Sequence, residues 1–250
     1  MKKIVTRLAT IALLGGAVSA FAIQPGPWTT FYTGLNGGYG WGEPSTSGLT
    51  LVSGVPTPAE NPIPNTLYPS LGGGTFGGQF GFDWQFDQWI VAGLKYDMDW
   101  SGLTGSVSVS PYVAGGTGKV NNGVLSASES LTWFGDLLPR LGFLPINNLL
   151  IYATGGLAFG HVDLSESTTS SRSNVTYPGS LNTTLPGWAV GAGAEWLITP
   201  HWSLSGEYLY NELDNVTFIA NRVPAYPPNA AQVTTVKNYQ TTELAINYRF

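Results

Sequence analysis

Hydrophobic side chains recur at every second position in eight separate segments of this chain. In segment 75–86, for example, Phe80, Phe82 and Trp84 share one face, while Gln79 and Asp83 share the other. An alternation with a period of two residues is typical of a β-strand whose two faces meet different surroundings. The segments that show it are 31–41, 75–86, 89–100, 129–142, 149–159, 187–198, 202–210 and 241–250.

The lengths of the connections between these segments alternate as well. Short links at 87–88, 143–148 and 199–201 are separated by long links at 42–74, 101–128, 160–186 and 211–240. The long links are rich in Pro, Gly, Ser, Thr and Asn, which favours irregular backbone. Short turns at one end and long loops at the other are the arrangement of an antiparallel up-and-down barrel that spans a membrane, with periplasmic turns and extracellular loops.

The size of the apolar side chains indicates which face points outward. Eight strands enclose a space that side chains just fill, and eight faces of large aromatics would exceed it. We therefore expect the apolar faces to meet lipid and the polar faces to point inward. Segment 129–142 should follow this rule, with Leu131, Trp133, Leu137 and Leu141 outward and Ser130, Thr132, Asp136 and Arg140 inward.

The tryptophans fall near the two ends of the predicted strands. Aromatic girdles at headgroup depth are expected at both edges of a lipid-embedded barrel. The predicted girdle residues are Trp84, Trp89, Trp196 and Trp202 at the periplasmic edge, and Trp41, Trp100, Trp133 and Trp188 at the outer edge.

Ten charged side chains fall on the inward faces and form a predicted charge network in the lumen. Lys95 and Arg140 should lie among carboxylates, because buried charges are costly unless they are paired or hydrated. The acidic excess should be hydrated, near a mouth of the barrel, or partly protonated; a cation-selective lining is the alternative. The network consists of Asp83, Lys95, Asp97, Asp99, Asp136, Arg140, Glu195, Glu207, Glu243 and Arg249.

The first residues have the three-part build of a secretory signal peptide. Lys2, Lys3 and Arg7 precede an apolar run from residue 8 to 18, and Ala20-Phe21-Ala22 resembles a cleavage site. We expect residues 1–22 to be cleaved, residues 23–30 to form a short periplasmic tail, and residues 31–250 to form one barrel domain in the outer membrane. Without the three basic residues of the leader, seven basic residues remain against 15 acidic ones, which argues against nucleic acid as a partner.

Candidate chemistry is sparse. The chain has no cysteine, which excludes disulfides, thiolate metal sites and cysteine nucleophiles. His161, near the outer end of a strand, is the only candidate for a lipid-modifying Ser/His pair, and no nucleophile stands at a telling spacing. We therefore expect no enzyme activity, no cofactor and no metal.

Several stretches resemble the Omp25/Omp31-like small outer-membrane barrels of alphaproteobacteria, the "porin family", which is related to OmpA-type and opacity-type barrels. They include the opening strand at 28–42, the glycine-bearing strand at 150–158, and segments 191–210 and 247–250. The resemblance implies that Tyr248 and Phe250 form the C-terminal signal read by the barrel-assembly machinery. Partners during biogenesis would then be that machinery and periplasmic chaperones.

These observations predict an integral outer-membrane barrel with a structural role, in contact with outer-membrane lipid and lipopolysaccharide. A barrel of this width is too narrow for general diffusion. Two alternatives stay open. One is a small cation-preferring channel, and the other is an adhesin or ligand-binding protein whose loops contact a host or surface ligand.

Overall fold

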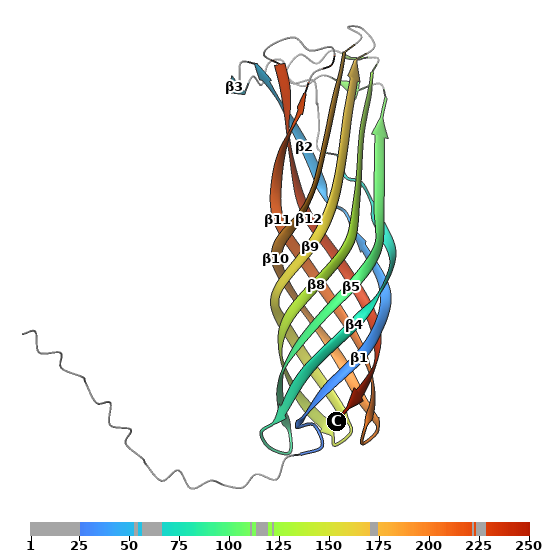
Figure 1. Ribbon diagram of the computed structural model, residues 1–250, viewed down its shortest axis with the longest axis vertical. Coiled ribbons are helices and arrows are strands. Elements are labelled where there is room, and N and C mark those ends of the chain that lie inside the picture. Colours follow the sequence, from blue (N-terminus) through green and yellow to red (C-terminus); the bar gives the residue numbers. More distant parts are fainter. Residues whose placement is uncertain are drawn as a thin grey trace, which may run out of the picture.

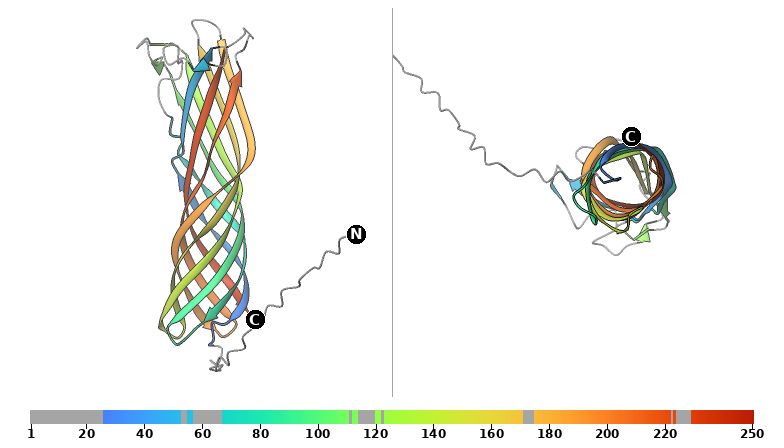
Figure 2. Two further views of the ribbon diagram at one scale, coloured as in Figure 1. Left: turned by 90° about the vertical axis from the view of Figure 1, so that its left-hand side faces the viewer. Right: turned by 90° about the horizontal axis from the view of Figure 1, so that it is seen from below.

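The computed structural model is a closed barrel that stands as a long, narrow cylinder (Figures 1 and 2). It describes residues 26–52, 55–56, 67–110, 112–113, 120–121, 123–170, 175–221, 223 and 229–250. The predicted signal peptide, residues 1–22, and the first three residues of the predicted tail lie outside the described residues. Within the described part of the chain, no helix is both long and apolar enough to cross a membrane.

Eight of the strands form the ring. They follow the order β1-β4-β5-β8-β9-β10-β11-β12, and pairing of β1 with β12 closes the circle. All these pairs are antiparallel. The ring strands are β1 (Thr30–Gly42), β4 (Leu71–Gln85), β5 (Ile90–Val109), β8 (Val124–Ile146), β9 (Leu149–Ser170), β10 (Val175–Thr199), β11 (Trp202–Asn221) and β12 (Asn229–Arg249).

The described part of the chain contains four further short strands. Strand β2 (Ser45–Val52) takes the place of β1 beside β12 in the upper part of the barrel, and β3 (Val55–Pro56) pairs with β2. Strands β6 (Tyr112–Val113) and β7 (Val120–Asn121) form a separate small hairpin. The predicted class, an eight-stranded antiparallel barrel, is confirmed.

The short turns at the lower end are fixed by side chains. The Oδ1 atom of Asp87 accepts hydrogen bonds from the backbone N–H groups of Trp89 and Ile90, at 2.7 and 2.9 Å. The Thr199 hydroxyl does the same for His201 and Trp202, at 3.3 and 3.0 Å. Such side-chain bonds let a tight turn satisfy backbone donors that have no ladder partner.

The prediction of long loops is wrong over much of their length, because many of these residues belong to strands. Strand β5 runs nine residues past Trp100, and β9 continues from Phe159 to Ser170. The link between strands four and five is also shorter than expected, because β8 runs to Ile146. The cylinder therefore extends well above the segment predicted from the apolar pattern (Figure 1).

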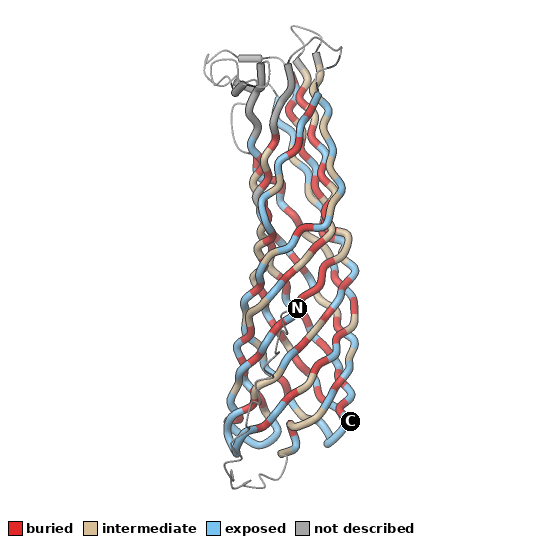
Figure 3. The backbone as a smooth tube through the Cα atoms, turned by 60° about the vertical axis from the view of Figure 1, so that its left-hand side comes forward, coloured by how far each residue is buried: buried red, intermediate tan, exposed pale blue. Residues whose placement is uncertain are grey.

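The upper part of the barrel reverses the polarity of the lower part. Below, large apolar side chains face outward, as at Phe80, which is 58% exposed. Above, the buried inward side chains are mostly apolar and the outward ones mostly Ser and Thr. Buried and exposed positions alternate along the described strands (Figure 3). An apolar interior with a polar exterior is the arrangement of a barrel wall surrounded by water.

A β-bulge accompanies the reversal on β8. Its register with β9 shifts between Leu131 and Trp133, and this extra residue exchanges the two faces of the strand. As a result Leu131 is buried in the lumen, whereas Ser130 and Thr132 are partly exposed on the outer face. The predicted orientation of these three residues is therefore wrong, while that of Leu137, Leu141, Asp136 and Arg140 agrees with their burial.

Candidate functional site: a closed lumen

The lowest charged layer of the lumen is a neutral cluster of two arginines and two carboxylates. Arg140 donates to both oxygens of Asp83, at 2.8 and 2.6 Å, and its Nη1 lies 2.9 Å from Glu195 Oε2. Arg249 bridges the same two carboxylates, at 2.8 Å from Asp83 and 2.9 Å from Glu195. All four side chains are at most 3% exposed. Each charge is thus compensated at close range, as burial requires.

This layer is built by every second strand of the ring. Asp83 lies on β4, Arg140 on β8, Glu195 on β10 and Arg249 on β12. In a tilted barrel, inward side chains of alternate strands fall at the same height. The four residues, distant in sequence, therefore meet in one layer across the lumen.

Aromatic rings cover the arginines. The Arg140 guanidinium lies 4.8 Å from the ring centre of Tyr32 and 4.9 Å from that of Tyr152. Arg249 lies 4.8 Å from the ring of Trp28. These are cation–π distances, and they are most favourable where water is excluded.

Trp28 closes the periplasmic mouth. It precedes the first strand, is fully buried, and donates from Nε1 to the carbonyl oxygen of Asn147 at 3.0 Å. The Trp28 carbonyl in turn accepts a bond from Arg249 Nη2 at 2.9 Å. Trp28 lies outside any alternating segment and falls in the predicted periplasmic tail, so its sequence position gives no sign of this contact.

The middle of the lumen is acidic. Lys95 Nζ lies 2.7 Å from Asp97 Oδ2 and also pairs with Glu207, which accepts a hydrogen bond from the Tyr152 hydroxyl at 2.8 Å. Lys95 and Arg140 thus each lie between two carboxylates, as expected from the sequence. Three further carboxylates lie at this level without a basic partner among the described residues: Asp99, Asp136 and Glu243.

Register places these acids against one another. Asp97 is directly opposite Asp136 on the neighbouring strand, and Glu207 is directly opposite Glu243. All four are at most 8% exposed. Of the three situations expected for the acidic excess, a position near a mouth does not apply, because these carboxylates are in the middle of the barrel. Hydration or protonation must therefore offset their repulsion.

Above the acidic layer the lumen is filled by an apolar plug. Leu103, Leu131 and Phe134 come from β5 and β8, and Leu213 comes from β11. The Phe134 ring packs on Tyr239 of β12, with 5.6 Å between ring centres. These five side chains are at most 3% exposed, so this level holds a packed core.

One ion pair and one single carboxylate lie within the plug, above the outer aromatic girdle. Glu129 pairs with Lys237; burial raises the pKa of Glu129, partly offset by Lys237, and lowers the pKa of Lys237. Glu166 is 5% exposed, and burial raises its pKa to about 7. Lys237 and Glu166 fall in predicted loops, although in the structure both continue the two-residue period of their strands.

Both predicted girdles face outward. Trp100 is 71% exposed, Trp188 45%, Trp89 60% and Trp196 57%, although all four are large apolar side chains. The girdles are eight residues apart along β10, and 11 residues apart from Trp89 to Trp100 of β5, which corresponds to roughly 20–28 Å at the rise and tilt of barrel strands. This height matches the apolar band of outer-membrane barrels, about 25 Å.

The chain end closes the ring. The N–H of Phe250 donates to the Phe31 carbonyl at 3.1 Å, and the Thr30 hydroxyl donates to the Phe250 carbonyl at 2.6 Å. The ring of Phe250 is 71% exposed and contacts Tyr248 edge-on, at 5.3 Å. Both aromatic side chains therefore present a surface to the periplasmic leaflet.

The two histidines make local contacts. His161 stacks on Trp133 with 5.5 Å between ring centres, and its Nδ1 lies 3.0 Å from the Thr184 hydroxyl oxygen. His201 lies in the lower turn, with Nδ1 3.0 Å from the Arg249 carbonyl oxygen.

An aromatic-girdled, closed antiparallel barrel with an apolar outer band defines an integral outer-membrane protein. The family described as "Outer membrane protein beta-barrel domain" matches residues 8–250, and the chain belongs to this family. It is 31% identical over 242 residues to a 31 kDa outer-membrane immunogenic protein of Brucella melitensis, covering 94% of this chain and 88% of that protein. It is also 32% identical over 139 residues to a 22 kDa outer membrane protein of Rhizobium leguminosarum, covering 55% and 52% of the two chains.

Among solved structures, the outer membrane protein OprG of Pseudomonas aeruginosa is similar in fold. The TM-score is 0.50 at 13% sequence identity, and the match covers 90% of this chain and 98% of that one. The predicted family, fold class and outer-membrane location are thereby confirmed.

Proposed function

We propose that this protein is a closed, non-conducting barrel that strengthens the outer membrane and carries a rigid wall above the bilayer. Its role is structural, with no catalytic step and no cofactor. The observation that carries the proposal is the apolar plug, in which Leu103, Phe134 and Leu213 fill the lumen at the level of the outer aromatic girdle. Ions cross a pore through polar, hydrated space, and a packed apolar segment opposes their passage.

Two lower features support the same reading. The neutral Arg140–Asp83 and Arg249–Glu195 cluster occupies the lumen with side chains that are already paired. Trp28 covers the periplasmic end. The acidic middle layer, which alone would favour a cation channel, thus lies between two closed levels.

Planar-bilayer recording tests this proposal. The refolded mature protein, residues 23–250, should show no stepwise current across voltages and salt concentrations. Removal of the plug in the triple variant Leu103→Ala, Phe134→Ala, Leu213→Ala should raise the conductance. Steady cation-selective openings of the unaltered protein would show instead that the channel alternative is right.

A matched control separates the plug from general loss of stability. The triple variant Leu94→Ala, Leu137→Ala, Leu157→Ala removes three leucines that face the membrane, 37–64% exposed in the structure. It should stay silent in the bilayer, because it leaves the lumen filled. Currents of the same size from both variants would mean that leakage follows from instability rather than from plug removal.

A further inference from the structure

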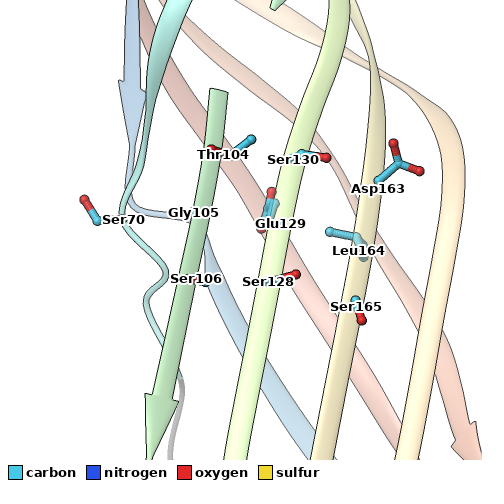
Figure 4. A pocket seen from close by; sticks show the side chains of 10 residues that line it. All are labelled: Ser70, Thr104, Gly105, Ser106, Ser128, Glu129, Ser130, Asp163, Leu164 and Ser165. Carbon is cyan, nitrogen blue, oxygen red and sulfur yellow. The ribbon is translucent and has the colours of Figure 1, made fainter. Parts of the chain in front are cut away.

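A shallow groove crosses the outer surface of the upper barrel. It has a volume of about 610 Å³ and runs over β5, β8 and β9 near the start of β4 (Figure 4). This volume lies within the range of small-ligand sites, about 300–1,000 Å³. Its outward side chains are short and mostly carry hydroxyl groups: Thr104, Ser106, Ser128, Ser130, Asp163 and Ser165.

Strand register arranges these hydroxyl groups in rows. Serines at every second position of β8 point outward because the inward positions hold the plug and Glu129. Each serine then meets a short polar side chain on both neighbouring strands. The two rows are Thr104–Ser130–Asp163–Asn182 and Ser106–Ser128–Ser165–Ser180.

The side chains of the second row have unused hydrogen-bonding capacity. Within the described part of the chain, Ser106, Ser128 and Ser165 make no side-chain hydrogen bond to one another or to a neighbour. In the first row, Asn182 donates to Asp163 Oδ1, which holds that carboxylate in place. A hydroxyl can both donate and accept, so the second row presents adaptable partners to a bound molecule.

The groove begins directly above the outer aromatic girdle. Trp133 is opposite Trp100 and stacks on His161, and Asp163 follows His161 by two residues, or about 7 Å along the strand. Girdle aromatics lie at the level of the lipid headgroups. Whatever extends from a headgroup into water next to the barrel therefore passes over these two rows.

The chemistry of the groove favours a neutral, polyhydroxylated ligand. Among the described residues no Lys or Arg lines it, and their one charged outward group is the Asp163 carboxylate, which opposes phosphate and other anions. The surface offers hydroxyl groups rather than a large apolar side chain, which opposes an acyl chain. We propose that this groove binds the neutral core sugars of an outer-leaflet glycolipid, and so anchors the rigid upper wall to the saccharide layer.

Binding of a lipid-free probe tests the inference. The refolded mature protein in detergent micelles is titrated with a neutral hexose oligosaccharide from the outer core of rough-type lipopolysaccharide, free of acidic sugars and phosphate, and binding is followed by calorimetry. Filling the groove with Ser128→Leu, or independently with Ser165→Leu, should weaken binding by about tenfold or more, because bulky side chains replace the hydroxyl partners. Ser47→Leu is the matched control: it is an exposed serine on β2 that does not line the groove, and should leave binding unchanged.

A second arm identifies the source of the sugar. In nanodiscs, rough-type lipopolysaccharide should raise the thermal midpoint of the unaltered protein more than deep-rough lipopolysaccharide that lacks the neutral core sugars, and Ser128→Leu should remove the difference. Equal stabilisation by the two glycolipids would overturn the inference, since contact would then rest on the lipid belt alone. Equal oligosaccharide affinity of the unaltered protein and both groove-filling variants, or no affinity at all, would overturn it as well. Because neither readout involves ion conduction, these outcomes are independent of the test of the closed barrel.

Discussion

Arg249, the penultimate residue, bonds Asp83 of β4 through Nη2 and Oδ2 at 2.8 Å, although 166 positions separate them in the sequence. Both side chains are fully buried. The contact reaches past β1, which lies between β12 and β4 in the ring. It therefore fastens the strand pair that closes the barrel.

Removal of this cation should destabilise the barrel. In Arg249→Met the carboxylates of Asp83 and Glu195 lose one of their two arginines, and breaking a buried pair costs about 3–5 kcal/mol. The measurement is the free energy of unfolding by urea in lipid vesicles. The double variant Arg249→Met, Asp83→Asn should recover part of the loss; an unchanged unfolding free energy in the single variant would contradict the assigned role.

Loss of the Trp28 side chain should open the periplasmic end and lower stability. Trp28→Ala removes a buried ring that packs on Arg249 and bonds the Asn147 carbonyl, and such truncations cost about 3–5 kcal/mol. Urea unfolding again gives the magnitude. Trp89→Ala, at a ring 60% exposed, is the control and should cost less; an equal or larger loss in the control would show that Trp28 adds no more than a surface aromatic.

Glu166 should make the upper wall more stable at acidic than at alkaline pH. Its pKa in the folded protein, about 7, exceeds the ordinary value of 4.5. The folded state therefore favours the protonated carboxyl group of Glu166. This contribution to stability is complete below about pH 4.5 and is lost as the pH rises through about 7. Glu166→Gln should raise the unfolding free energy by about 1–3 kcal/mol at pH 8 and change it little at pH 4.5.

The control for Glu166→Gln is the same substitution at an exposed position. Glu43→Gln serves as this control, because Glu43 is exposed at the end of the membrane segment. Its unfolding free energy should follow the unaltered protein at both pH values. The substitution Glu166→Gln could instead change the unfolding free energy by the same amount at pH 8 and at pH 4.5. That result would show that water reaches the Glu166 carboxylate in the folded state.

Phe250→Ala should reduce assembly in cells more than stability in vitro. The substitution keeps the backbone bond to Phe31 but removes the exposed ring at the chain end, the predicted signal for the assembly machinery. We expect the folded, heat-modifiable fraction in the outer membrane to fall at least severalfold, while the purified variant refolds normally. Phe86→Ala in the same girdle, 44% exposed, is the control; equal losses from both would leave Phe250 as an ordinary girdle residue.

The membrane-spanning half of the barrel could be predicted from sequence because its pattern follows from lipid on one face. Phe80 and Phe82 alternate with Gln79 and Asp83. In the structure Phe80 is exposed and Phe82 is partly exposed, whereas Gln79 and Asp83 are buried. The girdles follow from the same rule. A side chain that faces hydrocarbon must be apolar whatever its neighbours are, so the pattern of apolar residues alone reveals the lipid-facing side of a strand.

The strands of the upper wall could not be predicted from the sequence, because their outer face does not meet lipid. Leu164 and Glu166 continue the period of β9, yet the serines and threonines between them also suit a loop in water. Only the neighbouring strands show that Leu164 packs into a core. Because the outer face of that wall meets water rather than lipid, its pattern lacks the aromatic signal on which the prediction rested.

By itself the sequence determined the fold class, the family, the outward direction of the apolar faces in the membrane-spanning half, and the ten charges of the lower lumen; it did not reveal Glu129, Glu166 and Lys237 in the upper lumen. The tertiary structure decided which charges meet, where the carboxylates lack a cation, and that Trp28 and the plug close the lumen. Those outcomes depend on the height of each residue after the strands tilt, shift register and bulge. Height in a closed barrel is a property of all eight strands together, and no single segment contains it.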